Sequence, residues 1–199
     1  MKLKQKKKYV FLIGLAIIGI ISGFIFSFII SKGDKLLVES SISKYIYNIN
    51  NNNINYYKTF INSFSSSFLY TILIWILGIS IIGIPIILFL LFLKGFILGF
   101  SIGSIINIYK IKGILGAILY IFPHHIIIMI IYILLSYFAF TFSKKLFNYL
   151  FLKQEENLKK YARKYLKVLL IAFVVILVCS IIETFLSPIL FKLFTNYVI

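Results

Sequence analysis

Long apolar stretches alternate with short polar ones along this chain of 199 residues. A helix needs about 20 predominantly apolar residues to cross a bilayer, and inside lipid a helix satisfies its own backbone hydrogen bonds. The pattern therefore predicts an all-α, polytopic membrane protein with a single integral membrane domain over residues 1–199. Its five predicted transmembrane helices lie at about 9–30, 68–92, 95–109, 114–142 and 168–190.

The apolar run over 68–108 is about twice the length of one crossing, so it must fold back once. A turn at Lys94–Gly95 gives two crossings, the second one short. A turn at Gly83–Pro85 instead leaves Lys94 in mid-membrane, which costs about 2.5–3.5 kcal/mol on insertion scales. We therefore expect the turn at Lys94–Gly95, with Pro85 kinking the helix before it.

Two polar segments separate the crossings and indicate the topology. A loop over 31–66 follows the first helix, and a loop over 143–167 precedes the last one, with an amphipathic helix expected at 153–167. Eight basic residues lie between 144 and 167, and the first eight residues hold a second lysine cluster. The positive-inside rule places both clusters in the cytoplasm. The protein is thus predicted to be a multi-pass cell-membrane protein with a cytoplasmic N-terminus, an extracytoplasmic C-terminus and an outer loop that is either a spacer or a docking surface.

The formal net charge of +16 changes this picture little. Of 21 basic residues 20 are lysines, most of which flank apolar runs. This placement is typical of a topology signal with attraction to anionic lipid headgroups. The lipid bilayer is therefore the partner that the charge predicts, and nucleic acid is not.

Small residues recur every four positions in two of the apolar runs. Gly95, Gly99 and Gly103 form one such face, and Gly19 and Gly23 form another. Faces of this kind let two helices approach closely within lipid. The two faces are candidates for packing on each other within one chain or, in a homo-oligomer, between chains.

Two ionisable features lie within the predicted helices, the pair His124–His125 after Pro123 and Glu183, while Lys94 lies at the expected turn inside an apolar run. Adjacent histidines on a helix point about 100° apart, and one imidazole with one carboxylate is too small a ligand set for a tetrahedral metal site. We therefore predict no catalytic, cofactor-binding or metal-binding residues, and helix–helix or helix–backbone hydrogen bonds for these side chains. Two alternatives stay open. A small transporter or channel component needs an aqueous path lined by Lys94, His124 and Glu183, and an intramembrane enzyme needs His124 and Glu183 within about 6 Å.

Several short motifs follow one another in a fixed order: Leu73–Gly78, Gly83–Pro85, Phe92–Gly103, Phe122–His124 and Ile182–Pro188. Over about residues 60–192, this series resembles the stage II sporulation protein M family. The resemblance implies a role in engulfment during endospore formation, in the septal and engulfing membrane of the mother cell. It also implies a scaffold, not an enzyme, that anchors the peptidoglycan-cutting stage II sporulation proteins D and P. Carried over by position, the residues expected to serve fold or assembly are Gly95, Gly99, His124, Glu183 and Pro188.

Overall fold

The computed structural model describes residues 2–51, 53–121, 124–153 and 157–198. The prediction of an all-α polytopic membrane protein is confirmed, because five of its helices are long and apolar enough to cross a membrane. The helices are α1 (Lys2–Ile29), α2 (Lys32–Asn50), α3 (Tyr56–Ile79), α4 (Gly83–Ile121), α5 (His125–Phe151) and α6 (Leu158–Val198).

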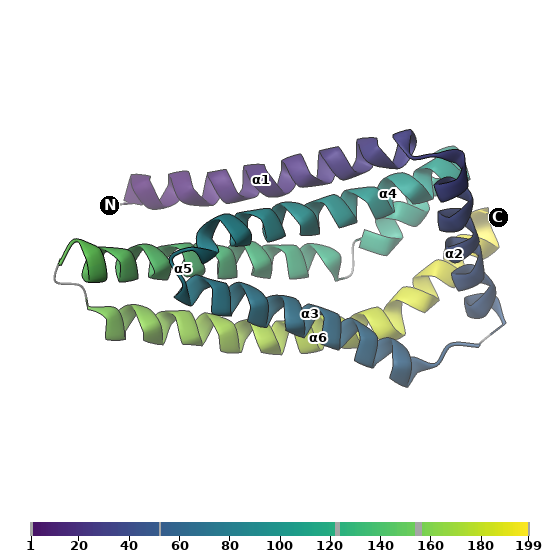
Figure 1. Ribbon diagram of the computed structural model, residues 1–199. Coiled ribbons are helices and arrows are strands. Elements are labelled where there is room, and N and C mark those ends of the chain that lie inside the picture. The colour runs from purple at the N-terminus through teal and green to yellow at the C-terminus, as the bar shows by residue number, and fades with distance from the viewer. Residues whose placement is uncertain (1, 52, 122–123, 154–156, 199) are drawn as a thin grey trace.

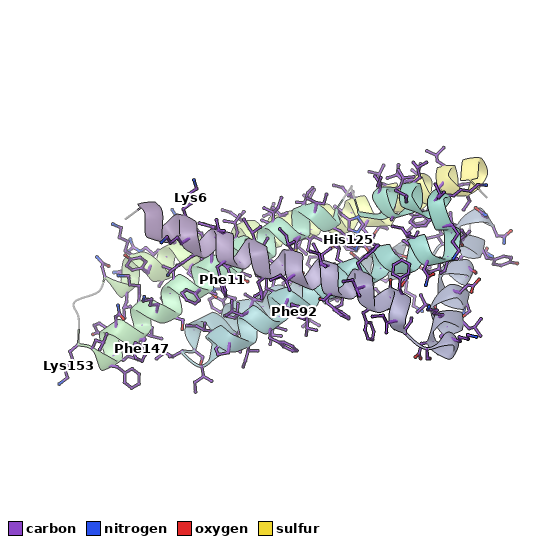
Figure 2. The ribbon with its side chains drawn as sticks, turned by 90° about the horizontal axis from the view of Figure 1, so that it is seen from above. Lys6, Phe11, Phe92, His125, Phe147 and Lys153 are labelled. Carbon is purple, nitrogen blue, oxygen red and sulfur yellow. The ribbon has the colours of Figure 1, made fainter. Side chains whose placement is uncertain are left out.

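The five long helices run side by side, and α2 lies across one end of the bundle (Figure 1). The N-terminus is at the opposite end from α2, and the C-terminus is at the α2 end. Lys6 and Lys153 mark the lysine-rich end in Figure 2. Within the bundle, α1 packs mainly along α4, whereas α3, α5 and α6 pack on one another. Large apolar side chains remain exposed along the long helices, as a lipid-facing surface requires.

The helix α4 reverses direction at Lys110, which has φ 55° and ψ −134°. The two arms are tightly packed, since a Cβ on Gly113 would meet the backbone of Ile105 and Ile106. The arm after the reversal and α5 both lead back toward the lysine-rich end (Figure 1). The sequence had predicted one helix over 114–142, whereas the structure divides this stretch between the second arm of α4 and α5.

The backbone at Lys110 gives a first prediction. Residues other than glycine rarely adopt a positive φ, and such strain costs about 1–3 kcal/mol. We expect Lys110→Gly to raise the free energy of unfolding by about 1 kcal/mol, measured by thermal unfolding in detergent. The exposed Lys112 is the matched control, because it has helical geometry: Lys112→Gly should leave stability unchanged or lower it by up to about 1 kcal/mol. A lower stability for Lys110→Gly than for Lys112→Gly would contradict this account.

The predicted turn at Lys94–Gly95 is wrong. The chain turns between α3 and α4, over 80–82, and Lys94 lies well inside α4. The crossing before the turn is nevertheless long enough, because α3 begins at Tyr56 and not near residue 68. Pro85 does not kink a helix either: it lies in the first turn of α4, where its missing N–H needs no partner.

The predicted loops are largely helical. The segment 31–66 contains α2 and the first turns of α3, and 143–167 contains the end of α5 and the start of α6. The amphipathic segment expected at 153–167 forms the first turns of α6 from Leu158 onward, in one continuous helix with the last crossing. At the α2 end a small apolar cluster joins α2 to the bundle, made by Ile46, Ile49, Ile105, Ala117, Phe191 and Phe194.

The two small-residue faces meet at the contact between α1 and α4. A Cβ on Gly23 would overlap the carbonyl of Phe96, and a Cβ on Gly99 would overlap the carbonyl of Ile20. Backbone approach this close explains why glycine occupies these positions. The same contact includes Gly19, Gly95 and Gly103.

Candidate functional site

A polar pocket lies between α3, α4, α5 and α6. Its volume is about 100 Å³. Figure 2 places His125, one of its lining residues, between the middle of the bundle and its α2 end. We call it the central pocket, and its polar lining consists of Ser66, Ser67, Lys94, Ser101, His124, His125 and Glu183.

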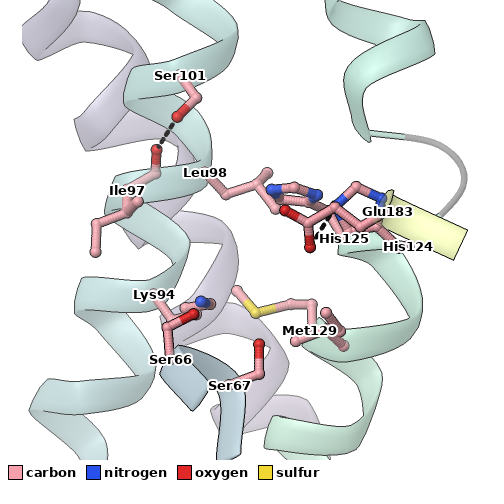
Figure 3. A pocket seen from close by; sticks show the side chains of 11 residues that line it. Ser66, Ser67, Lys94, Ile97, Leu98, Ser101, His124, His125, Met129 and Glu183 are labelled. Carbon is pink, nitrogen blue, oxygen red and sulfur yellow. Dashed lines mark hydrogen bonds and ion pairs between the residues drawn. The ribbon is translucent and has the colours of Figure 1, made fainter. Parts of the chain in front are cut away.

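Glu183 of α6 has specific partners at one wall of the central pocket (Figure 3). Its Oε2 accepts a hydrogen bond from the hydroxyl of Ser63 on α3 and lies 3.4 Å from Nε2 of His124. His124 is almost fully buried, at 1% exposure, whereas the side chain of Glu183 is 32% exposed. The carboxylate is therefore held by neighbouring helices while part of it still faces open space.

The start of α5 adds a further favourable interaction at this wall. His124 is the N-cap residue of α5, and its carbonyl accepts the N–H of Ile128. The N-terminal end of a helix carries partial positive charge, which favours a nearby carboxylate such as that of Glu183. The ring of His125 lies against that of His124, with centroids 4.1 Å apart.

Lys94 lies at the other wall and is held in a different way. Its Nζ is 5.4 Å from the ring centroids of both Tyr70 and Tyr132, a distance at which aromatic faces attract a cation. Both rings are fixed by their own hydroxyl groups: Tyr70 donates to the carbonyl of Leu90, and Tyr132 donates to that of Ser67 at 3.4 Å. This arrangement compensates for part of the cost of placing a lysine inside the bundle.

The serines of α3 are the site residues that sequence reasoning missed. Ser63 and Ser67 are buried one helical turn apart, on the same face as Thr71, and Ser66 lines the pocket beside them. Because of these hydroxyl groups, the sequence just before residue 68 is polar, and it was therefore predicted to be a loop. The four-residue spacing of Ser63, Ser67 and Thr71 was the available signal, since it places hydroxyls on one helical face.

The structure brings together three of the residues singled out in the sequence. Lys94, His124 and Glu183 all line the central pocket. Pro188 lies within α6 outside the lining, and Pro123 lies outside the described residues. His124 and Glu183 meet the distance condition of the intramembrane-enzyme hypothesis. Within the described part of the chain, no group of three or more metal-ligating side chains occurs.

A second, larger cavity lies beneath α2, with a volume of about 530 Å³. We call it the vestibule. Ser101 and Glu183 line both cavities, so the vestibule adjoins the central pocket at these two side chains. The rest of its wall is mostly apolar and comes from α2, α3, α4 and α6: Leu37, Val38, Ser41, Ile42, Tyr45, Thr59, Phe100, Ser104, Ile105 and Phe191.

A match was found in the comparison with protein families. The family model for stage II sporulation protein M matches residues 10–188, which include all six helices in whole or in part. In comparisons with curated proteins and with solved structures, nothing matched this chain. The family match includes Lys94, His124 and Glu183.

Proposed function

The chain belongs to the stage II sporulation protein M family, and from this premise we propose that it is a non-catalytic scaffold of the engulfment machinery. In this role it anchors the peptidoglycan hydrolases of that process, stage II sporulation proteins D and P, in the septal and engulfing membrane of the mother cell. The coarser conclusion, a sporulation-related multi-pass membrane protein, follows from the family and from the five apolar helices. The family match is the observation that carries the proposal.

The charge distribution supports an orientation for the scaffold. Both lysine clusters lie at the end of the bundle opposite α2 (Figure 2). We propose that this end is cytoplasmic, by the positive-inside rule, and that α2 and the C-terminus are extracytoplasmic. The α2 end would then face the compartment in which peptidoglycan is cut.

The exposed side of α2 is the surface we propose for the partners. Leu36 is 66% exposed and Tyr47 is 65% exposed, although other residues of α2 pack on α4 and α6. Exposed apolar and aromatic side chains on a rigid element are typical of a surface that binds another protein. A homo-oligomer would also need a surface of this kind, because the glycine faces are covered within one chain.

Co-purification from sporulating cells tests the scaffold. We expect tagged wild-type chain, solubilised in detergent, to recover the two hydrolases, and the double variant Leu36→Ser, Tyr47→Ser to recover about tenfold less. Leu150 and Phe151 are also exposed but lie at the opposite end of the bundle, so Leu150→Ser, Phe151→Ser is the matched control and should recover wild-type amounts. Hydrolases missing from a well-folded wild-type preparation would refute the scaffold.

A small transporter or channel component is a second candidate, favoured by the central pocket. Lys94, His124 and Glu183 line one cavity, as such a path requires, and the vestibule adjoins it. Flux measured in liposomes with the purified chain separates this candidate from the scaffold, because anchoring a hydrolase needs no flux.

A further inference from the structure

We propose that the central pocket is a binding site for a small zwitterion of the α-amino-acid type, with its carboxylate at Lys94 and its ammonium at Glu183. The proposal needs neither hydrolase anchoring nor transport. It rests on the separation of the two charges, the size and lining of the pocket, and the adjoining vestibule.

Lys94 and Glu183 are the two charged residues of the pocket, and Figure 3 shows them on opposite sides of it. Opposite charges attract strongly inside a protein, where the effective dielectric constant is low. Direct pairing would therefore be the expected arrangement. Among the described residues, however, Oε2 of Glu183 lies 3.4 Å from Nε2 of His124, and Lys94 forms no ion pair.

Separate contacts hold each charge at its own wall. The rings of Tyr70 and Tyr132 flank the ammonium of Lys94, and Ser63 and His124 hold Oε2 of Glu183. The cation and the anion thus remain apart without collapse of the cavity between them. A ligand with complementary charges binds such a preorganised pair without a rearrangement of the protein.

The pocket has the size and polarity for a small ligand of this class. A dry apolar cavity of about 150 Å³ binds benzene, so the central pocket, at about 100 Å³, suits the smallest amino acids. Hydroxyl groups of Ser66, Ser67 and Ser101 also line it. These groups supply the neutral hydrogen-bonding partners that remain after the two charges are paired.

The vestibule provides the route from the α2 end. Ser101 and Glu183 form part of both cavities, so a molecule in the vestibule reaches these two side chains where the cavities adjoin. The hydroxyl of Ser101 donates to the carbonyl of Ile97, 3.0 Å away, which fixes its place at the junction. A larger side chain at position 101 would block the passage and leave Lys94 and Glu183 unchanged.

Water is the alternative occupant, because a polar cavity of this size also accommodates ordered water. Ligands that carry both charges, or only one of them, distinguish the two cases. We would measure equilibrium binding of radiolabelled glycine and alanine to the full chain in lipid nanodiscs, with acetate and methylamine as competitors. A zwitterion site should bind glycine or alanine at least about tenfold more tightly than either single-charge compound.

Single substitutions then assign the two ends of the ligand. Lys94→Met and Glu183→Gln should each weaken glycine binding by about tenfold or more, since each removes one charge-assisted contact. Lys112→Met is the control: it removes an exposed lysine that lines neither cavity, and binding should be unchanged. If Lys94→Met or Glu183→Gln fails to fold, Ser101→Leu provides an independent test, because glycine should associate with it at least about tenfold more slowly than with wild type.

Two results would overturn the proposal. One is the absence of glycine and alanine binding to folded wild-type chain at millimolar concentration, which would indicate a water-filled pocket. The other is acetate binding as tight as that of glycine, which would leave Glu183 without a role. Neither result bears on the scaffold, whose readout is hydrolase recovery.

Discussion

Gly99→Leu is expected to lower the free energy of unfolding by about 3 kcal/mol or more. A Cβ at this position would already overlap the carbonyl oxygen, carbonyl carbon and Cα of Ile20, and these backbone atoms cannot move aside as a flexible side chain can. The two helices would have to separate along their contact, with loss of packing that also involves Gly23 and Gly95. Denaturant or thermal unfolding of the detergent-solubilised chain measures the effect.

Gly14→Leu is the matched control, because no atom lies within 4 Å of a Cβ added there. Gly14 lies in α1, the helix that packs against Gly99, and leucine is a better helix former than glycine. Its stability should therefore equal that of wild type or exceed it by up to about 1 kcal/mol. Equal stability of Gly99→Leu and wild type would contradict the close packing of α1 on α4.

This expectation affects how partner recovery is interpreted. A Gly99→Leu chain that fails to recover hydrolases would show a disrupted fold and would not locate a binding surface. The substitutions on α2 avoid this problem, because Leu36 and Tyr47 are exposed and their replacement leaves the packing of the bundle unchanged.

His124 and Glu183 should show strong coupling in a double-mutant cycle. Glu183→Leu removes the partner of the buried His124 and the acceptor of the Ser63 hydroxyl, so we expect a loss of about 1–3 kcal/mol in unfolding free energy. His124→Ala should lower the unfolding free energy by a similar amount. The double variant should lose less than the sum of the two by about 1 kcal/mol, because either single substitution already breaks the contact.

A distant substitution provides the reference for this cycle. Phe147 lies on α5 near the lysine-rich end, far from the central pocket (Figure 2). The effects of Phe147→Leu and His124→Ala should add to within about 0.5 kcal/mol. If the changes in unfolding free energy caused by His124→Ala and Glu183→Leu are as additive as those of the reference pair, the two side chains do not interact in the folded chain.

The sequence predicted the helical class and the number of crossings, because both depend on local properties. The length of an apolar run decides whether it spans the bilayer. The four-residue spacing of Gly95, Gly99 and Gly103 likewise predicted a close helix contact, and the structure places these residues against α1. The partner face with Gly19 and Gly23 was a candidate for the same reason.

The turn between α3 and α4 was not predictable in the same way. The free-energy cost used for Lys94 applies to a lysine whose side chain is surrounded by lipid. This cost favoured a position for Lys94 at a turn, outside the hydrocarbon core. In the folded chain Tyr70 of α3 and Tyr132 of α5 surround its ammonium. These contacts join segments that are remote in sequence, so no local pattern reports them.

The central pocket was predicted in part. Lys94, His124 and Glu183 were conspicuous because ionisable residues are rare in apolar helices. Their meeting in one cavity depends on the packing of α4, α5 and α6, which the sequence did not show. Ser63 and Ser66 were assigned to a loop, since hydroxyl groups that face a polar interior look the same in sequence as those that face water.

The contact between α1 and α4 also constrains how the chain is assembled during synthesis. Gly95 follows Gly19 by 76 residues, so α1 leaves the ribosome long before the helix against which it packs. Until α4 enters the membrane, the glycine face of the first helix is exposed to lipid or to other newly made chains. The order of translation therefore differs from the order of packing, and in a chain cut short after α3 the glycine face of α1 would stay uncovered.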